Sequence, residues 1–471
     1  MSGLRERMLR LRGGTPAPEQ DPRPQTEPDV DERKTAEDGP GSSARETAAA
    51  AASMAAFDST DHSEAAAWAR LQVDEHVGEQ GSFLLRRVEH ALDARHGLHV
   101  LGELAPAAGA LAAFHRADPE APLPSADNLL FLDLETTGLG VGTGNVPFMV
   151  GIAYAAGERF VVEQLFIRHP AEERAMLAYL EQRMQGRSYL VTYNGKTFDW
   201  PVLAGRYIMN GFGRRREALR HLDFLHPSRS IWRNTLTSCR LSHVEEERLG
   251  IRREHDVPGS EAPAIYFRYL ADGDPAPLAG VFRHNELDML SLAALAIRFG
   301  RLLGGELQLP EPEHGEERMR TALWLEKMGA SDEAERRYER LTAEMSGAGP
   351  WALPLAARDK KVGNWRRAVV LWQKIALQAE EAAAPCLDAH IELAMYYEHR
   401  VRDLKAAIRY AEAAERLALR RAGLERAGGS ARAHLTAIRS RLERLQRKTN
   451  KGNGSYGGQA HRRSARAVDR P

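Results

Sequence analysis

The chain has 471 residues, a length that favours two or three domains. Of these residues 43% are hydrophobic and 28% are charged, which are the proportions of a globular protein, so most of the chain should fold. A formal net charge of +0 neither indicates nor excludes a polyanionic partner. The two cysteines, Cys239 and Cys386, exclude a disulfide framework and a cysteine metal cluster, and no apolar run has membrane-spanning length, which together favour a cytoplasmic protein without a membrane partner.

The N-terminal part of the chain is predicted to hold a disordered segment and a helical lead-in. Pro, Glu, Asp, Ser and Ala dominate residues 1–63, which lack the large apolar side chains needed to offset the entropy of ordering. A helical lead-in is expected over residues 64–125, and its first helix should run from about Glu64 to Leu92. The Pro-rich stretch from Asp118 to Pro124 precedes the next domain.

A central strand, Asn128 to Gly138, lies at the start of the domain predicted over residues 126–304. Five of its first seven residues are apolar, which is typical of a strand buried on both faces. Asp133 and Glu135 lie two positions apart, so their side chains point to the same face. Two carboxylates so placed are costly unless a cation neutralises them, although acidic residues before Thr-Thr-Gly are also common in turns.

Strands and helices alternate after the central strand. The predicted elements are two strands, a helix, a strand and a closing helix: Pro147 to Tyr154, Arg159 to Ile167, Pro170 to Met184, Tyr189 to Tyr193, and Pro277 to Leu303. A further helix should begin near Asp199. Three strands, a helix, a strand and a helix, in this order, are the layout of the RNase H-like fold, an α/β fold in which a mixed sheet is flanked by helices.

The residues beyond Pro310 are predicted to be wholly helical. An Ala-x-x-x-aromatic signature begins at Ala334, Ala368 and Ala406, at spacings of 34 and 38 residues, close to the tetratricopeptide period. We therefore expect a TPR-like helical domain over residues 311–425. The matching helix-helix turns are expected at Gly329, Gly363 and Asp403. A generic helical bundle is the alternative, because the full repeat pattern is not met.

A basic, partly disordered tail is predicted over residues 426–471. Arginine and lysine greatly outnumber acidic residues from Arg420 onward. Such a segment is typical of an electrostatic arm, and we expect it to be helical at first and then disordered.

Two more carboxylates are predicted to join Asp133 and Glu135. Asp199 follows a strand and opens a helix, and Asp288 lies on the closing helix, one turn after His284. Four carboxylates that converge from a strand, a helix start and a closing helix form an oxygen-rich cage, which suits two Mg²⁺ or Mn²⁺ ions. Two such ions can activate a water and stabilise the departing oxygen in phosphodiester cleavage.

At these residues the chain resembles the DEDD superfamily of 3′-5′ exonucleases and, more closely, the YprB-like group of bacterial proteins. The motifs that carry the resemblance, in order, are Asp133-x-Glu135-Thr-Thr-Gly138, Asn194-x-x-x-Phe198-Asp199 and His284-x-x-x-Asp288. Further resemblance runs through Leu222 to Arg229 and Asp256 to Ser260, and the whole covers roughly Asn128 to Leu303.

This resemblance implies roles for the motif residues. The metal ligands would be Asp133, Glu135, Asp199 and Asp288, and His284 would orient or deprotonate the attacking water. The substrate contacts would be Thr136, Thr137, Gly138, Asn194 and Phe198. In the superfamily the third motif usually has a histidine five positions before the aspartate, or a tyrosine four before it. Here a histidine stands at the tyrosine spacing, so a structural role for His284 stays open.

Other phosphate-binding interpretations fail on spacing. The glycine-rich loop, Gly138, Gly140, Gly142 and Gly144, lacks the two-residue gap of a dinucleotide fingerprint, and Leu190 stands where a P-loop before Gly195 requires a glycine. The basic run Arg214, Arg215, Arg216 and Arg220 is either solvated surface or a phosphate contact.

The sequence therefore predicts a metal-dependent nuclease, a 3′-5′ exonuclease that acts on the end of single-stranded DNA or RNA and whose helical repeats offer a surface to a protein partner. Two alternatives stay open. One is a catalytically silent adaptor that binds nucleic acid and, through its helical repeats, a protein. The other is a structure-specific endonuclease on the same fold, because nothing in the sequence separates DNA from RNA or an end from an internal bond.

Overall fold

The computed structural model describes residues 65–138, 144–213, 219–310, 312–344, 349–382, 386–424 and 429–464. The predicted disordered segment, residues 1–63, lies outside these ranges. So do Gly140 and Gly142 of the glycine-rich loop, and Arg214, Arg215 and Arg216 of the basic run.

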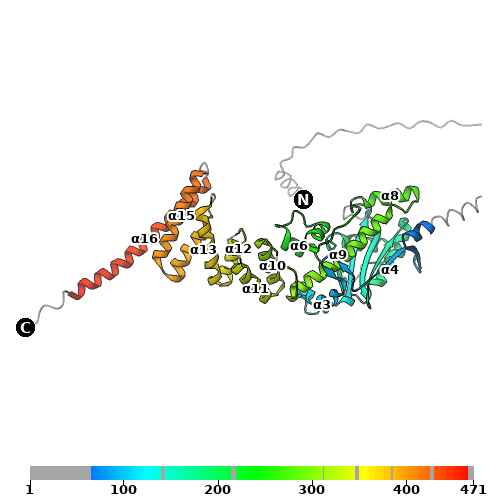
Figure 1. The fold of residues 1–471 in the computed structure, drawn as a ribbon, viewed down its shortest axis with the longest axis horizontal. Coiled ribbons are helices and arrows are strands. Elements are labelled where there is room, and N and C mark those ends of the chain that lie inside the picture. The colour runs from blue at the N-terminus through cyan, green and yellow to red at the C-terminus, as the bar shows by residue number, and fades with distance from the viewer. Residues whose placement is uncertain are drawn as a thin grey trace, which may run out of the picture. The chain divides into compact units, whose positions relative to one another are not determined.

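A seven-stranded mixed sheet occupies the first half of the described chain (Figure 1). Its strands are β1 (Val73–Gly78), β2 (Gly81–Ala91), β5 (Leu129–Thr136), β6 (Pro147–Ala156), β7 (Arg159–Phe166), β8 (Tyr189–Thr192) and β9 (Arg220–Asp223). They lie in the order β1-β2-β7-β6-β5-β8-β9; β8 is parallel to both β5 and β9, and the other neighbours are antiparallel. The predicted mixed sheet around the Asp133 strand is therefore confirmed.

The N-terminal hairpin corrects one prediction. A helix was expected from about Glu64 to Leu92, but only residues 65–70 of its described part are helical, and residues 73–78 and 81–91 form β1 and β2. The hairpin turns at Gly81, whose φ of 116° favours glycine. β2 then pairs with β7 over eight residues, from Leu84 to Ala91, so a long-range ladder outweighs the weak helical spacing of the apolar residues.

Helices cover both faces of the sheet. They are α3 (Leu104–Ala108), α4 (Glu173–Met184), α5 (Asp199–Met209), α6 (Leu225–Trp232), α7 (Leu241–Val244), α8 (Ala262–Asp272) and α9 (Leu278–Gly304). The alternation of β5 divides the core: Leu129 and Phe131 pack with the middle of α9, whereas Leu130 and Leu132 pack with α4 and α5 on the other face. Asp133 lies two residues after Phe131 on β5, so its side chain points to the same face of the sheet, toward α9.

Eight short elements of the described chain lie among these strands and helices and the helices that follow. The short strands β3 (Arg95–His96) and β4 (His99–Val100) pair with each other and form a second, two-stranded sheet. The short helical segments are η1 (Leu101–Glu103), η2 (Gly109–His115), η3 (Ala126–Asn128), η4 (Pro170–Glu172), η5 (Glu245–Leu249) and η6 (Tyr397–Val401). None of the described helices combines the length and the apolar character needed to cross a membrane.

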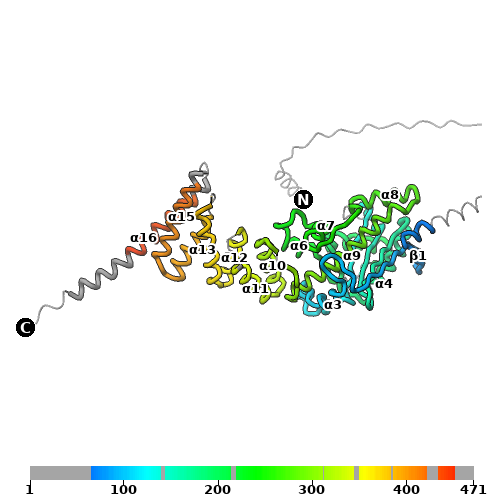
Figure 2. Tube along the Cα trace, in the orientation of Figure 1, coloured from blue at the N-terminus to red at the C-terminus, as the bar shows by residue number. Residues whose placement is uncertain are grey.

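The C-terminal region is helical, as predicted (Figure 2). Its helices are α10 (Gly315–Met328), α11 (Ser331–Glu344), α12 (Ala352–Val362), α13 (Trp365–Glu381), α14 (Asp388–Tyr396), α15 (Leu404–Leu424) and α16 (Gly429–Ser464). The three signature alanines are buried in α11, α13 and α15, and Gly329 and Gly363 end α10 and α12 with positive φ. Whether these pairs are tetratricopeptide repeats stays a prediction.

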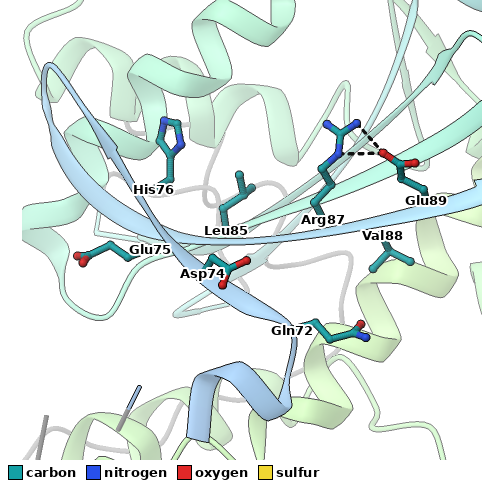
Figure 3. Close-up of a pocket in the computed structure, with 8 residues that line it drawn as sticks. All are labelled: Gln72, Asp74, Glu75, His76, Leu85, Arg87, Val88 and Glu89. Atoms are coloured by element: carbon teal, nitrogen blue, oxygen red, sulfur yellow. Dashed lines mark hydrogen bonds and ion pairs between the residues drawn. The ribbon is translucent and has the colours of Figure 1, made fainter. Parts of the chain in front are cut away.

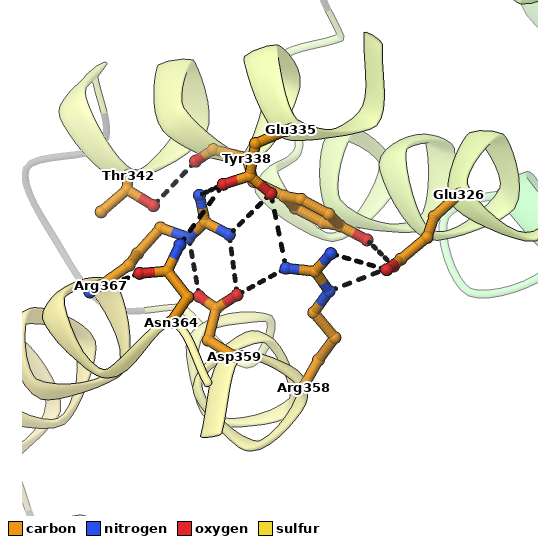
Figure 4. A network of polar contacts seen from close by, with 8 residues as sticks. All are labelled: Glu326, Glu335, Tyr338, Thr342, Arg358, Asp359, Asn364 and Arg367. Carbon is orange, nitrogen blue, oxygen red and sulfur yellow. Dashed lines mark hydrogen bonds and ion pairs between the residues drawn. The ribbon is translucent and has the colours of Figure 1, made fainter. Parts of the chain in front are cut away.

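Ion pairs join consecutive helix pairs of this region (Figure 4). Arg367 of α13 donates from Nε to Asp359 Oδ2 at 2.7 Å and from Nη1 to Glu335 Oε1 at 2.5 Å. Arg358 donates from Nη2 to Glu326 Oε1 at 2.6 Å. Asp359 is fully buried, and a buried carboxylate is tolerated when cations pair with it in this way.

Candidate functional site

The four predicted carboxylates come from three elements, β5, α5 and α9. Asp133 and Glu135 project from β5, Asp199 is the first residue of α5, and Asp288 lies in the middle of α9. Glu135, Asp199 and Asp288 are buried, with exposures of 7%, 5% and 8%. Asp133 keeps some contact with solvent.

The charges of these carboxylates affect one another's pKa values. Burial raises the pKa of Asp133 well above its ordinary value, and the charges of Asp288, Asp199 and Glu135 raise it further. Burial is also the main cause that raises the pKa of Glu135, and the charges of Asp288 and Asp199 raise it further. The pKa of Asp199 rises to about 7, chiefly through burial. The carboxylates therefore repel one another when all are ionised, and a cation would relieve the repulsion.

A buried arginine already pairs with one of the four. Arg253 donates from Nη2 to Asp288 Oδ1 and to Glu245 Oε1, the latter at 2.5 Å, and from Nε to Glu245 Oε2 at 2.7 Å. The Arg253 side chain is 6% exposed and that of Glu245 is fully buried. Glu245 therefore holds the guanidinium against Asp288.

The donor set, rather than its present spacing, suits a divalent cation. Among the residues that the structure describes, no three His, Cys, Asp or Glu side chains are arranged to hold a metal ion. The oxygen-only donors Asp133, Glu135, Asp199 and Asp288 nevertheless match the preference of Mg²⁺ and Mn²⁺. The raised pKa values of Asp133, Glu135 and Asp199 indicate that ionised carboxylates at this site repel one another. A cation at Asp288 would compete with Arg253 for the carboxylate.

His284 lies between two carboxylates. Its Nδ1 is 2.9 Å from both Oδ1 and Oδ2 of Asp256, and its Nε2 is 3.5 Å from Asp288 Oδ2. The predicted proximity of His284 and Asp288 is therefore confirmed. Arg253 Nη1 is 3.2 Å from His284 Nδ1 and also 3.2 Å from Asp256 Oδ2. If Nδ1 carries the proton and donates to Asp256, then Nε2 is left as an acceptor that faces Asp288.

The second-motif loop is built around Asp223 at the end of β9. Asp223 accepts from the backbone N–H groups of Asn194 at 2.9 Å and Lys196 at 3.1 Å. Asn194 has a φ of 72°, and its Oδ1 accepts from Thr197 Oγ1 at 2.7 Å. A Cβ at Gly195 would lie 2.5 Å from Thr192 Cβ, so this turn requires glycine. The Asn194 side chain thus shapes the turn that leads to Asp199.

Of the other predicted substrate contacts, Thr136, Thr137 and Gly138 lie at the start of the glycine-rich loop, and Phe198 lies just before α5. Thr136 Oγ1 donates to the Gly138 carbonyl at 2.7 Å, and Thr137 Oγ1 accepts from Val146 N at 3.1 Å. Phe198 is half-buried before α5. These contacts position the loop ends, and binding of substrate by these residues stays a prediction. Arg220, of the basic run, pairs instead with Asp118, since its Nε lies 3.0 Å from Asp118 Oδ2.

Four residues near the carboxylates had no role in the sequence prediction. Asn285 donates from Nδ2 to Asp133 Oδ2 at 3.2 Å, and Arg253, Asp256 and Asp223 make the contacts described above. Asp223 and Asp256 lie in stretches that resemble the family, and Asn285 lies inside the third motif. Arg253 carries no signal in the sequence, because only the fold brings it to α9.

A surface hollow on the hairpin lies apart from this site (Figure 3). It has a volume of about 610 Å³ and is lined by residues of β1 and β2 and by Gln72: Gln72, Asp74, Glu75, His76, Leu85, Arg87, Val88 and Glu89. None of the four carboxylates lines it. The candidate site is therefore defined by its side chains rather than by this hollow.

Comparison with known proteins agrees with the fold. The model of the RNase H superfamily matches residues 130–299. The chain is also 33% identical, over 351 residues, to a Bacillus subtilis (strain 168) protein described as uncharacterized protein YprB. That alignment covers 73% of this chain and 83% of the relative.

Proposed function

The chain belongs to the RNase H superfamily and, within it, to the family of YprB, and from this premise we propose that it is a metal-dependent nuclease, specifically a 3′-5′ exonuclease. The superfamily supports a nuclease-type fold acting on nucleic acid. The finer activity is supported by the four carboxylates that β5, α5 and α9 contribute: burial and the neighbouring carboxylate charges raise the pKa values of Asp133, Glu135 and Asp199. An adaptor that only binds nucleic acid has no use for such a costly cluster.

In this proposal Asp133, Glu135, Asp199 and Asp288 hold two divalent cations, Mg²⁺ or Mn²⁺, in keeping with the metals that this fold usually uses. Bound cations supply charge neutralisation for the attacking and departing oxygens of a phosphodiester. The protein supplies the ionised carboxylates and a buried frame that fixes them.

His284 orients or deprotonates the attacking water. Asp256 fixes the ring through Nδ1, and this contact leaves Nε2 free to accept a proton beside Asp288. Arg253 balances the charge of Asp288 and Glu245 while the site is metal-free.

The substrate is the end of a single-stranded DNA or RNA. Thr136, Thr137, Gly138, Asn194 and Phe198 line its path, since the first three directly follow Glu135 and the other two lie shortly before Asp199 along the chain. The helical region, residues 311–425, is proposed to bind a protein partner, and the protein is proposed to work in the cytoplasm. Residues 126–304 are proposed as the nuclease domain, residues 64–125 as its N-terminal lead-in, now with the β1–β2 hairpin, and residues 426–471 as a tail.

Purified protein incubated with end-labelled single-stranded DNA and RNA tests the proposal. With Mn²⁺ or Mg²⁺ we expect stepwise shortening from the 3′ end, which stops with chelator and in Asp133→Asn and Asp288→Asn variants. Internal cuts would favour the endonuclease alternative. Binding without cleavage in every condition, or unchanged cleavage by both variants, would overturn the catalytic assignment.

A further inference from the structure

A single polar row crosses the sheet and ends at Asp133. Arg86 of β2 pairs with Gln164 of β7, Gln164 pairs with Gly151 of β6, and Gly151 pairs with Asp133 of β5. Directly paired residues of neighbouring strands share a face, so these four positions form one line on one face of the sheet. The row begins on a strand far from the motifs and ends at a predicted metal ligand.

Asn285 of α9 fills the gap that Gly151 leaves in this row. A Cβ at Gly151 would lie 2.1 Å from Asn285 Oδ1 and 2.6 Å from Asn285 Nδ2. Gly151 does not have a positive φ, so glycine is needed there for space and not for backbone freedom. Asn285 is fully buried and bridges Gln164, at 3.0 Å, and Asp133, at 3.2 Å.

The direction of every hydrogen bond in the row follows from its first member. A guanidinium can only donate, so Arg86 Nη1 donates to Gln164 Oε1 at 2.6 Å. Gln164 must then turn its Nε2 to α9, where it donates to Asn285 Oδ1 and, at 2.6 Å, to the Phe282 carbonyl. Asn285 is left with only N–H groups for Asp133. The chain of donors Arg86, Gln164 and Asn285 therefore delivers an N–H to the carboxylate.

The Arg86 end of this donor chain is fixed by further contacts. Arg86 Nη1 is 2.7 Å from Glu286 Oε2, and Arg86 Nε donates to the Leu71 carbonyl at 3.2 Å. Glu286 also lies 3.3 Å from His90 Nε2. Because Gln164 is fully buried, no water competes for its amide, and the amide orientations are set by the protein alone.

We propose that Arg86, Gln164 and Asn285 are positioning residues that hold the Asp133 carboxyl group in one orientation, with Oδ2 occupied by the Asn285 N–H and Oδ1 left for a divalent cation. The inference rests on the proposed function and makes the β1–β2 hairpin part of the site.

Calorimetric titration of the full chain with MnCl₂ tests the proposal without any nucleic acid. Gln164→Glu keeps the size and the contact with Arg86 but removes the donor, and Arg86→Met removes the origin of the chain. Gly151→Ala keeps every polar group and displaces only Asn285. Each should weaken Mn²⁺ binding roughly 10–100-fold, as substitutions of residues behind metal ligands do, and Arg86→Lys should restore part of the affinity.

Matched controls lie beside these residues. Arg87 neighbours Arg86 on β2 but pairs with Glu89 and Glu163, and a Cβ at Gly205 in α5 would meet nothing within 4 Å. Arg87→Met and Gly205→Ala should bind Mn²⁺ within about twofold of the wild type. Equal affinities for Arg86→Met and Arg87→Met, with Gln164→Glu unchanged, would overturn the donor chain alone. A wild-type protein that binds no Mn²⁺ would overturn the proposed function as well.

Discussion

At Asp288, one carboxylate faces both a guanidinium and an imidazole. Arg253 donates to Oδ1, and His284 Nε2 lies 3.5 Å from Oδ2. Asp256 holds the far side of the imidazole at 2.9 Å. These contacts agree with the proposed role of His284 as a base that Asp256 orients, with Arg253 as an internal cation, and they lead to two predictions.

The first prediction concerns His284. His284→Ala should lower turnover by roughly two to four orders of magnitude, the usual contribution of a general base, with Mn²⁺ affinity nearly unchanged. Asp256→Asn should give a smaller loss, because Nδ1 loses its anionic partner. His284→Tyr, which restores the residue that this spacing usually carries in the DEDD superfamily, should retain far more activity than alanine. Single-turnover rates measure all three, and a fully active alanine variant would make His284 a structural residue.

The second prediction concerns pH in metal-free protein. The pKa of Asp199 rises from an ordinary value of 3.8 to about 7 in the folded state, and that of Asp133 also rises. Between about pH 4 and pH 7 these carboxyl groups are more protonated in the folded state than in the unfolded state. The free energy of unfolding should therefore fall as the pH rises from about 4 to about 7.

Asp133→Asn removes one of these groups and should flatten that slope. At pH 8, in the presence of a chelator, the melting temperature of the Asp133→Asn variant should exceed that of the wild type by roughly 4 °C. This is the shift expected when the free energy of unfolding increases by about 1–2 kcal/mol. Thermal unfolding between pH 5 and pH 8 measures it. Parallel curves for the two proteins would contradict the charge repulsion inferred for the site.

At the scale of elements, α16 differs from a free basic arm. Ile438 and Leu445 are buried, and Arg444 Nη2 and Lys448 Nζ lie 2.9 Å and 2.6 Å from the carboxylate of Glu398. Glu398 is the buried member of these pairs, with a side-chain exposure of 1%. Part of the tail's charge is therefore used to fasten α16 to η6.

The third prediction separates this fastened part from the rest of the tail. Deleting residues 449–471 removes basic residues beyond the Glu398 contacts, so it should weaken nucleic-acid binding and reduce its dependence on salt, while cleavage of saturating substrate stays unchanged. Glu398→Gln, which keeps those residues, should instead destabilise the helical region and leave the salt dependence at least as steep. Titrations of nucleic-acid binding between 50 and 200 mM salt test this prediction. If the affinity depends on salt with the same slope with and without the tail, the tail binds something other than nucleic acid.

At the scale of the whole molecule, the sheet and the helical region share one hydrophobic core. Trp324 of α10 lies 5.4 Å, between ring centroids, from Phe299 of α9, and both belong to the cluster that includes Phe131. Arg248 donates from Nη2 to the buried Glu317 of α10 at 2.7 Å. The nuclease-type domain is therefore packed directly against the first helix of the helical region.

The fourth prediction follows from this shared core. A chain that ends at residue 304 exposes the Phe299 surface and should melt lower, or aggregate, whereas a chain that ends at residue 344 keeps α10 and α11 and should recover most of the stability. Trp324→Ala in the full chain should cost about 3–5 kcal/mol. Equal melting of the two truncated chains would show that the domains are energetically independent.

The sequence by itself determined the elements whose signals are local. The apolar run around Asp133, the helical spacing of His284 and Asp288, and the recurring alanines of the C-terminal helices each depend on neighbouring residues, and the structure places them as predicted. The helical prediction for β2 was wrong, because a strand of this kind is decided by its partner, β7, which lies far away in the sequence.

Only the tertiary structure decided which residues surround the carboxylates. Three residues near the carboxylates come from parts of the chain far from β5: Arg253, Asp256 and Asn285. No spacing in the sequence relates them to Asp133. Gly151 looks like an ordinary strand glycine until Asn285 is seen in the space beside it. Local periodicity fixes the direction of a side chain on its own element, but the partner of a buried polar group depends on packing between elements, and that is settled only when the whole core forms.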